Sequence, residues 1–146
     1  MSNSMLLSDA IRIGCAFNKQ GFHALKLEDG STCALGAALE GLGINLGRKR
    51  VSIDYTITGE LIPLSTALPS YVNDFTKVLE CPHCVKPNKM YSVRNTVMHL
   101  NDTHGVSRED IADFVEQWEI ANGHKAAAAK PEVTEVAQEA ELVAVN

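Results

Sequence analysis

Two cysteines and two histidines, spaced C-x2-C-x14-H-x4-H, are the feature of this 146-residue chain that most restricts its fold. The cysteines are Cys81 and Cys84 in the stretch ECPHC, and the histidines are His99 and His104 in MHLNDTH. Zinc takes four such ligands in a tetrahedron, and two cysteines separated by two residues can reach one ion from a single tight turn. The spacing falls within the range of known zinc sites. We therefore predict a structural zinc site formed by these four residues.

The two histidines impose a condition on the helix that the stretch SVRNTVMHLND predicts. Five residues of continuous helix would rotate His104 by roughly 140° away from His99, at 3.6 residues per turn. A helix break near Asn101 or Asp102 would bring the two imidazoles back to one side. His83 lies between the cysteines and is an alternative ligand, although a residue in that place usually points away from the metal.

The ligand set also bears on whether the metal performs chemistry. A catalytic zinc keeps an open position and has three protein ligands, whereas the four ligands predicted here leave none open. A zinc deaminase would carry H-x-E ahead of P-C-x-x-C, and this chain has ECPHC with no H-x-E before it. A thioredoxin-like motif or a metal-dependent nuclease would use only one of the two ligand pairs and leave the other unexplained. We therefore expect the protein not to be an enzyme.

Composition and periodicity divide the chain into three regions. Residues 1–78 form a predicted α+β region, 79–121 a zinc-binding helical region, and 122–146 an Ala- and Glu-rich tail that we expect to be disordered. The apolar share of 45% suits a folded core, and because aromatic residues make up only 5%, that core should consist of Leu, Ile, Val and Ala.

The predicted fold class is α+β, with a small helical N-terminal unit and a short β-hairpin or strand, followed by a C2H2-type zinc site on a helix pair. Leucines alternate with Lys26 ahead of the turn signal Asp29-Gly30, which predicts the hairpin. Small residues in the first two helices, among them Gly14 and Ala37, predict that these helices pack closely. We predict helices over 4–18, 33–44 and 70–80 and a strand over 51–58. Gly43 is the expected stop of the second helix, and Ser70 is the expected cap of the third.

The last predicted helix, REDIADFVEQWEIA, has one apolar and one acidic face. Ser107 is its expected cap, with Asp110 at the capping-box position. The apolar stripe comprises Ile111, Phe114, Val115 and Trp118. The acidic face, which would repel phosphates and suits a basic protein partner, comprises Glu109, Asp110, Asp113, Glu116 and Glu119.

Nucleic-acid binding is the second prediction for the partner, after a protein. The basic turn Arg48, Lys49 and Arg50 is the one cluster of cations, and Arg94 and Asn95 would lie near the base-reading positions of a zinc-finger helix. The formal net charge of −5 argues against a large nonspecific nucleic-acid surface. A protein partner therefore ranks first, DNA or RNA second and a metal-dependent nuclease last.

The N-terminus and the cysteine usage predict a cytoplasmic protein. MSNSMLLSDAIRIG has no basic lead followed by a long apolar run, and no stretch approaches the length of a membrane span. The thiols are then expected to stay reduced. Cys15 and Cys33 have no partners at ligand spacing and are predicted to be buried thiols.

Two stretches follow a recognisable pattern. MHLNDTHGVSREDIADFVEQWE fits HLND-x-H-x-[WV]-[ST]-R-E-x-I-A-x-[WF], and CALGAALEGLG contains Cys-Ala-Leu-Gly-Ala-Ala. Together with the cysteine turn, this pattern resembles short phage and prophage proteins that mostly have no assigned activity. The resemblance implies a cytoplasmic accessory protein encoded by a phage or prophage, and implies no activity. The residues that carry the match in the C-terminal stretch are His99, Leu100, Asn101, Asp102, His104, Ser107, Arg108, Glu109, Ile111 and Ala112.

Overall fold

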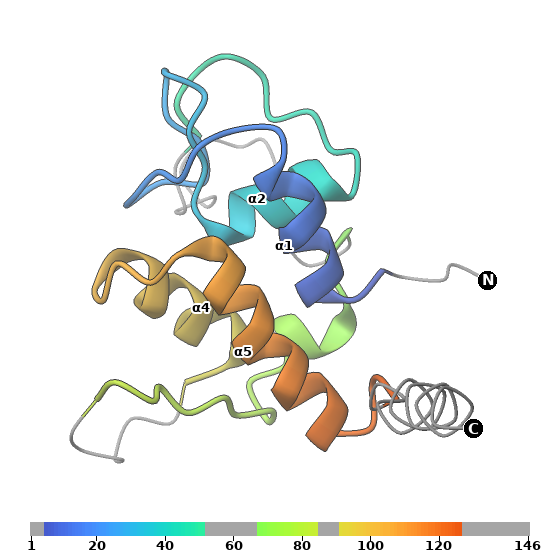
Figure 1. The fold of residues 1–146 in the computed structure, drawn as a ribbon. Coiled ribbons are helices and arrows are strands. Elements are labelled where there is room, and N and C mark those ends of the chain that lie inside the picture. Colours follow the sequence, from blue (N-terminus) through green and yellow to red (C-terminus); the bar gives the residue numbers. More distant parts are fainter. Residues whose placement is uncertain (1–4, 52–66, 85–90, 127–146) are drawn as a thin grey trace, which may run out of the picture.

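The computed structural model describes residues 5–51, 67–84 and 91–126, and within these ranges the chain is mostly helical (Figure 1). α1 packs against both α2 and α5, while α4 contacts α2, α5 and the short turn η1. The core between them consists mainly of Leu, Ile, Val and Ala, as the composition predicted, with one tyrosine and one cysteine. The elements are α1 (Leu7–Cys15), α2 (Ala34–Gly41), the 3-10 turn η1 (Ser70–Val72), α4 (Val93–Asp102) and α5 (Arg108–Ala121).

The predicted α+β class is wrong for the described residues, which contain no β-strand. The Asp29-Gly30 turn does form, with Gly30 at a φ of +89°. Beyond it only isolated bridges remain, joining Lys26 to Thr32 and to Val51. Because Cys33 already caps α2, the second arm of the predicted hairpin ends at Thr32 and is too short to form a β-ladder. The strand predicted over 51–58 lies outside the described residues except for Val51.

The helix predicted over 70–80 is also wrong beyond its first turn. Only the 3-10 turn η1 forms, and its cap is Pro69, not Ser70. Asp74 then accepts hydrogen bonds from the backbone N–H and the hydroxyl of Thr76, at 2.9 and 2.6 Å. Such a local side-chain turn competes with helical hydrogen bonding, which explains why the helix does not continue.

Two predicted helix ends are confirmed. The Ser107 hydroxyl accepts a hydrogen bond from the Asp110 backbone N–H at 3.1 Å and so caps α5. Gly43 follows α2 with a φ of +87°, and the N–H of Ile44 bonds back to the carbonyl of Leu39 at 3.0 Å. Gly43 therefore ends α2 in the left-handed conformation that favours glycine.

Close packing of α1 on α2 depends on glycine. A Cβ built on Gly14 would lie 1.7 Å from the carbonyl oxygen of Ala37, and one on Gly41 would lie 2.0 Å from that of Ala10. The two helices therefore approach backbone to backbone, as the small residues predicted, although Ala16 is exposed and takes no part.

We expect Gly14→Ala to destabilise the protein, because the added methyl group overlaps a backbone atom that cannot rotate away. Overpacking of this kind typically costs about 1–3 kcal/mol. The free energy of unfolding from urea titration measures the effect, with Ala16→Val, which adds two methyl groups at an exposed site, as the control. Equal stability of Gly14→Ala and the wild type would contradict the packing.

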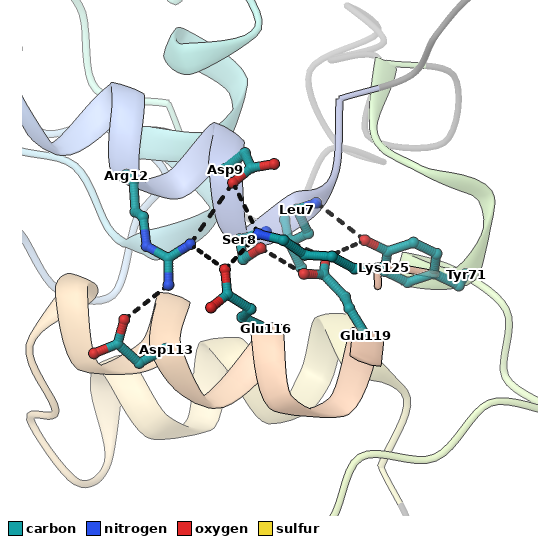
Figure 2. Close-up of polar contacts among 9 residues, drawn as sticks. All are labelled: Leu7, Ser8, Asp9, Arg12, Tyr71, Asp113, Glu116, Glu119 and Lys125. Atoms are coloured by element: carbon teal, nitrogen blue, oxygen red, sulfur yellow. Dashed lines mark hydrogen bonds and ion pairs between the residues drawn. The ribbon is translucent and has the colours of Figure 1, made fainter. Parts of the chain in front are cut away.

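The N-terminus of α1 is capped by side chains from η1 and α5 (Figure 2). Its own N-cap, Leu6, makes no side-chain cap. Instead the N–H of Leu7 donates to the Tyr71 hydroxyl at 3.0 Å, and the N–H and hydroxyl of Ser8 donate to the Glu119 carboxylate at 3.3 and 2.5 Å. The Tyr71 hydroxyl donates to the same carboxylate. Burial and this bond both raise the pKa of Tyr71.

The prediction that Glu119 lies on an outer acidic face is therefore wrong, because its side chain is completely buried. A buried carboxylate is costly unless it is hydrogen-bonded, and here three donors satisfy it. The positive end of the α1 dipole favours the negative charge as well.

Two more residues of the expected acidic face bind α1 (Figure 2). The Arg12 guanidinium lies 2.8 Å from Asp113 and 2.7 Å from Glu116. Lys125 contacts the same Glu116 carboxylate at 2.6 Å. The hydrogen bonds from Arg12 and Lys125 lower the pKa of Glu116 from its usual 4.5 to about 2.

We expect these contacts to make stability depend on pH below neutrality. Because the folded-state pKa of Glu116 is depressed, its contribution is complete above about 4.5 and is lost as the pH falls toward about 2. The unfolding free energy of the wild type should fall more steeply across this window than that of Glu116→Gln. Glu109→Gln, at an exposed site of the same helix, is the control and should follow the wild type. Parallel pH curves for Glu116→Gln and the wild type would contradict the expectation.

Candidate metal centre

The four predicted ligands come together in the structure. The ligand atoms of Cys81, Cys84, His99 and His104 all lie within 4.8 Å of one another. The Cys84 sulfur is 3.1 Å from Nε2 of His99 and 3.6 Å from Nε2 of His104, and the two Nε2 atoms are 3.0 Å apart. Tetrahedral zinc with ordinary bond lengths separates its ligand atoms by about 3.3–3.8 Å. The cluster therefore has the dimensions of a site that could hold one metal ion.

The cysteine turn is anchored to both C-terminal helices by the segment before it. The N–H of Leu79 donates to the carbonyl of Tyr91 at 3.1 Å, and the hydroxyl of Thr96 donates to the carbonyl of Leu79 at 2.5 Å. The indole N–H of Trp118 donates to the carbonyl of Val78 at 2.9 Å. Trp118 thus acts as a structural anchor, and these three bonds set where the cysteines emerge.

The histidines meet because α4 ends between them. The helix stops at Asp102, where a break was predicted, and Gly105 takes a φ of +60°. The N–H of Val106 then returns to the carbonyl of Leu100 at 3.0 Å, which fixes the turn. This turn brings the second histidine back to the side of the first. His83 is exposed and is not part of the four-atom cluster.

Asn101, which lies between the two histidines near the end of α4, binds the first residue of α2. Its side-chain oxygen accepts from the N–H of Ala34, the first residue of α2, at 3.2 Å, and from Gln20 at 2.9 Å. Its amide nitrogen donates to the carbonyl of Gly21 at 3.0 Å. Asp102 accepts the N–H of His23 at 2.9 Å. The residues between the metal ligands therefore hold the loop 16–33 to α4.

Arg108 extends this attachment from the start of α5. Its guanidinium is 4% exposed and donates to the Thr32 hydroxyl at 2.7 Å and to the carbonyl of Asn18. The sequence placed Arg108 in the first turn of α5 but gave no sign of a buried side chain. Its partners are carbonyl and hydroxyl oxygens of a loop far away in the sequence, and no local pattern marks them.

The nucleic-acid candidates lie on two different elements. Arg48, Lys49 and Arg50 are exposed in the loop 42–51, whereas Arg94 and Asn95 belong to the first turn of α4. The Arg94 guanidinium donates to Asn73 at 3.2 Å and lies 5.7 Å from the centre of the Phe75 ring.

The two remaining cysteines do not belong to the cluster. Cys33 is buried, as predicted, and its thiol accepts the N–H of Gly36 at 3.5 Å as the cap of α2. Cys15 is only half-buried. Burial raises the pKa of both thiols to about 11, so neither has the thiolate character of a catalytic nucleophile.

No protein-family model, curated protein or solved structure matches this chain. Among the described helices, none is both long and apolar enough to cross a membrane.

We expect Asn101→Ala to destabilise the protein strongly, because it leaves buried backbone groups of Gly21 and Ala34 without their partners. Each such loss costs about 1–3 kcal/mol, so a decrease of about 2–4 kcal/mol in unfolding free energy is expected. Asn95→Ala, six residues earlier on α4, is the matched control. If both variants are equally stable, Asn101 does not hold the loop.

Proposed function

We propose that this protein is a small binding module whose C-terminal half is stabilised by a structural zinc ion. The observation that carries the proposal is the convergence of two thiols and two imidazole nitrogens within 4.8 Å. The two Nε2 atoms are 3.0 Å apart and both lie close to the Cys84 sulfur, which is the arrangement that one metal ion bound by all four groups requires. A metal ion satisfies all four groups at once.

Zinc is the metal that this ligand set favours. Two thiolates and two imidazoles in a compact cluster are typical of zinc, whereas magnesium and calcium prefer oxygen ligands. Four protein ligands fill a tetrahedron, which supports a structural role and no enzymatic activity. Zinc of this kind contributes directly to folding, because the unfolded chain has no preformed site.

Two observations bear on the partner, namely the resemblance of the sequence and the extent of the acidic face. The resemblance to phage and prophage proteins favours an accessory protein acting in a bacterial cytoplasm on a host or phage protein, with DNA or RNA as the alternative. The acidic face that favoured a basic protein is smaller than expected, since Glu119 is buried while Asp113 and Glu116 bind Arg12. The smaller acidic face therefore favours DNA or RNA over a protein as the partner.

We expect the protein purified without added metal to contain about one zinc ion per chain. Cys81→Ser should lose the zinc and unfold at lower temperature, because it removes one ligand and with it the binding free energy that stabilises the fold. Metal content by plasma mass spectrometry and thermal unfolding by circular dichroism measure the two effects.

His83→Ala is the matched control, because His83 lies in the same turn but outside the cluster. It should keep both the zinc and the thermal stability. A wild-type protein without zinc, or a Cys81→Ser variant with a full complement of zinc, would overturn the proposal.

A further inference from the structure

The loops 16–33 and 42–51 lie together at one end of the molecule (Figure 1), and this end carries a run of exposed cations. Arg48, Lys49 and Arg50 are consecutive and exposed, and within the described ranges none of them forms an ion pair. The two loops together carry five Lys or Arg residues against one Glu and one Asp, although the whole chain has a net charge of −5. Two of these five, Lys19 and Lys26, are paired with Asp29 and Glu40, which leaves the three cations of the basic turn. Away from this end, Arg12 and Lys125 are paired with Glu116.

The basic turn is held beside the loop 16–33 rather than extending freely. Asn45 accepts the N–H of Gly47 at 2.8 Å, and Gly47 takes a φ of +78°. At the other end, the N–H of Val51 donates to the carbonyl of Lys26 at 2.9 Å, and the N–H of Leu25 donates to the carbonyl of Val51 at 2.9 Å. These bonds place Arg50 directly beside the loop 16–33.

That neighbouring loop exposes two phenylalanine rings. Phe17 is 60% and Phe22 is 40% exposed, in a chain that has only four phenylalanines and a core made mainly of aliphatic residues. The backbone around Phe22 is fixed, because Asn101 holds the carbonyl of Gly21 and Asp102 holds the N–H of His23. Exposed aromatic rings on a rigid backbone are typical of binding surfaces.

We propose that this end of the module binds single-stranded nucleic acid, with Arg48, Lys49 and Arg50 contacting phosphates and Phe17 and Phe22 stacking on bases. Single-strand binding combines cations that follow the backbone with aromatic rings that accept any base. A duplex would use only the cations, because its bases are already stacked. The proposal deepens the function proposed above by naming its partner, and it rests on the same folded, zinc-bound protein.

The binding experiment uses the full-length zinc-bound protein and a fluorescein-labelled oligothymidine of about 20 nucleotides, followed by fluorescence anisotropy. Three neutralised phosphates predict a salt slope near −2, so affinity should fall about 20-fold between 50 and 200 mM salt. A duplex of the same length should bind at least about fivefold more weakly, because stacking on Phe17 and Phe22 is lost.

Two sets of variants separate the charge from the stacking. Replacing all three cations by glutamine (Arg48→Gln, Lys49→Gln, Arg50→Gln) should remove most of the binding and its salt dependence. Phe17→Ala with Phe22→Ala should weaken binding to the single strand at least about fivefold while leaving the salt slope unchanged. The matched controls are Lys77→Gln and Phe75→Ala, which change an exposed cation and an exposed phenylalanine outside the two loops.

The proposal is overturned if the wild type does not bind the oligothymidine at 50 mM salt, or if the controls weaken binding as much as the loop variants do. If the oligothymidine does not bind, the exposed cations and phenylalanines would instead contact a protein partner. Zinc content is measured on every sample. A protein with one zinc per chain and no affinity for the oligonucleotide contradicts only the nucleic-acid proposal, whereas a protein without zinc contradicts the structural zinc site itself.

Discussion

Two histidines five residues apart can bind one metal ion only if the helix that carries them ends between them. In this protein α4 ends at Asp102, and much of the structure depends on the turn that follows. Because α4 stops at Asp102, the chain turns through Gly105 and sends α5 back along α1. The same turn directs Asn101 and Asp102 onto the loop 16–33, and it starts α5 where Arg108 can reach that loop. One short segment thus supplies two of the four residues of the candidate metal cluster and also attaches the loop 16–33.

The C-terminal end of α5 is held by a second interaction, the burial of Glu119 against α1. Glu119 is buried at the N-terminus of α1, and its charge is tolerated because Ser8 and Tyr71 donate to it where the helix dipole is positive. Around it, Arg12 and Lys125 bridge the two helices through Glu116. α5 is therefore attached to α1 by polar contacts at one end and to the loop 16–33 by Arg108 at the other, with the aliphatic core between them.

The features that the sequence predicted are local ones. The Ser107 cap and the Gly43 stop each depend on residues within a few positions of one another, and the four candidate metal ligands lie within the 24 residues 81–104. Small residues likewise predicted the close contact of α1 with α2. The features that were missed depend on distant partners: Glu119 lies 111 residues from Ser8, and Arg108 lies 76 residues from Thr32. The predicted hairpin was wrong for a related reason. Alternating leucines fit a buried loop as well as a strand, and the chain forms a loop here because α2 begins directly afterwards.

The metal centre and the proposed binding face share their structural support. Asp102 lies between the two histidine ligands and holds the N–H of His23, while Asn101 holds the carbonyl of Gly21, so both residues flanking Phe22 are fixed from the metal-binding segment. His23 has a positive φ of 66°, a conformation that a residue other than glycine adopts at a cost and that the bond to Asp102 helps to hold. The candidate metal cluster and the bonds that fix the backbone around Phe22 therefore come from one segment, the end of α4 and the turn after it. The loop 16–33 needs no large core of its own, because hydrogen bonds from α4 and α5 hold it in place.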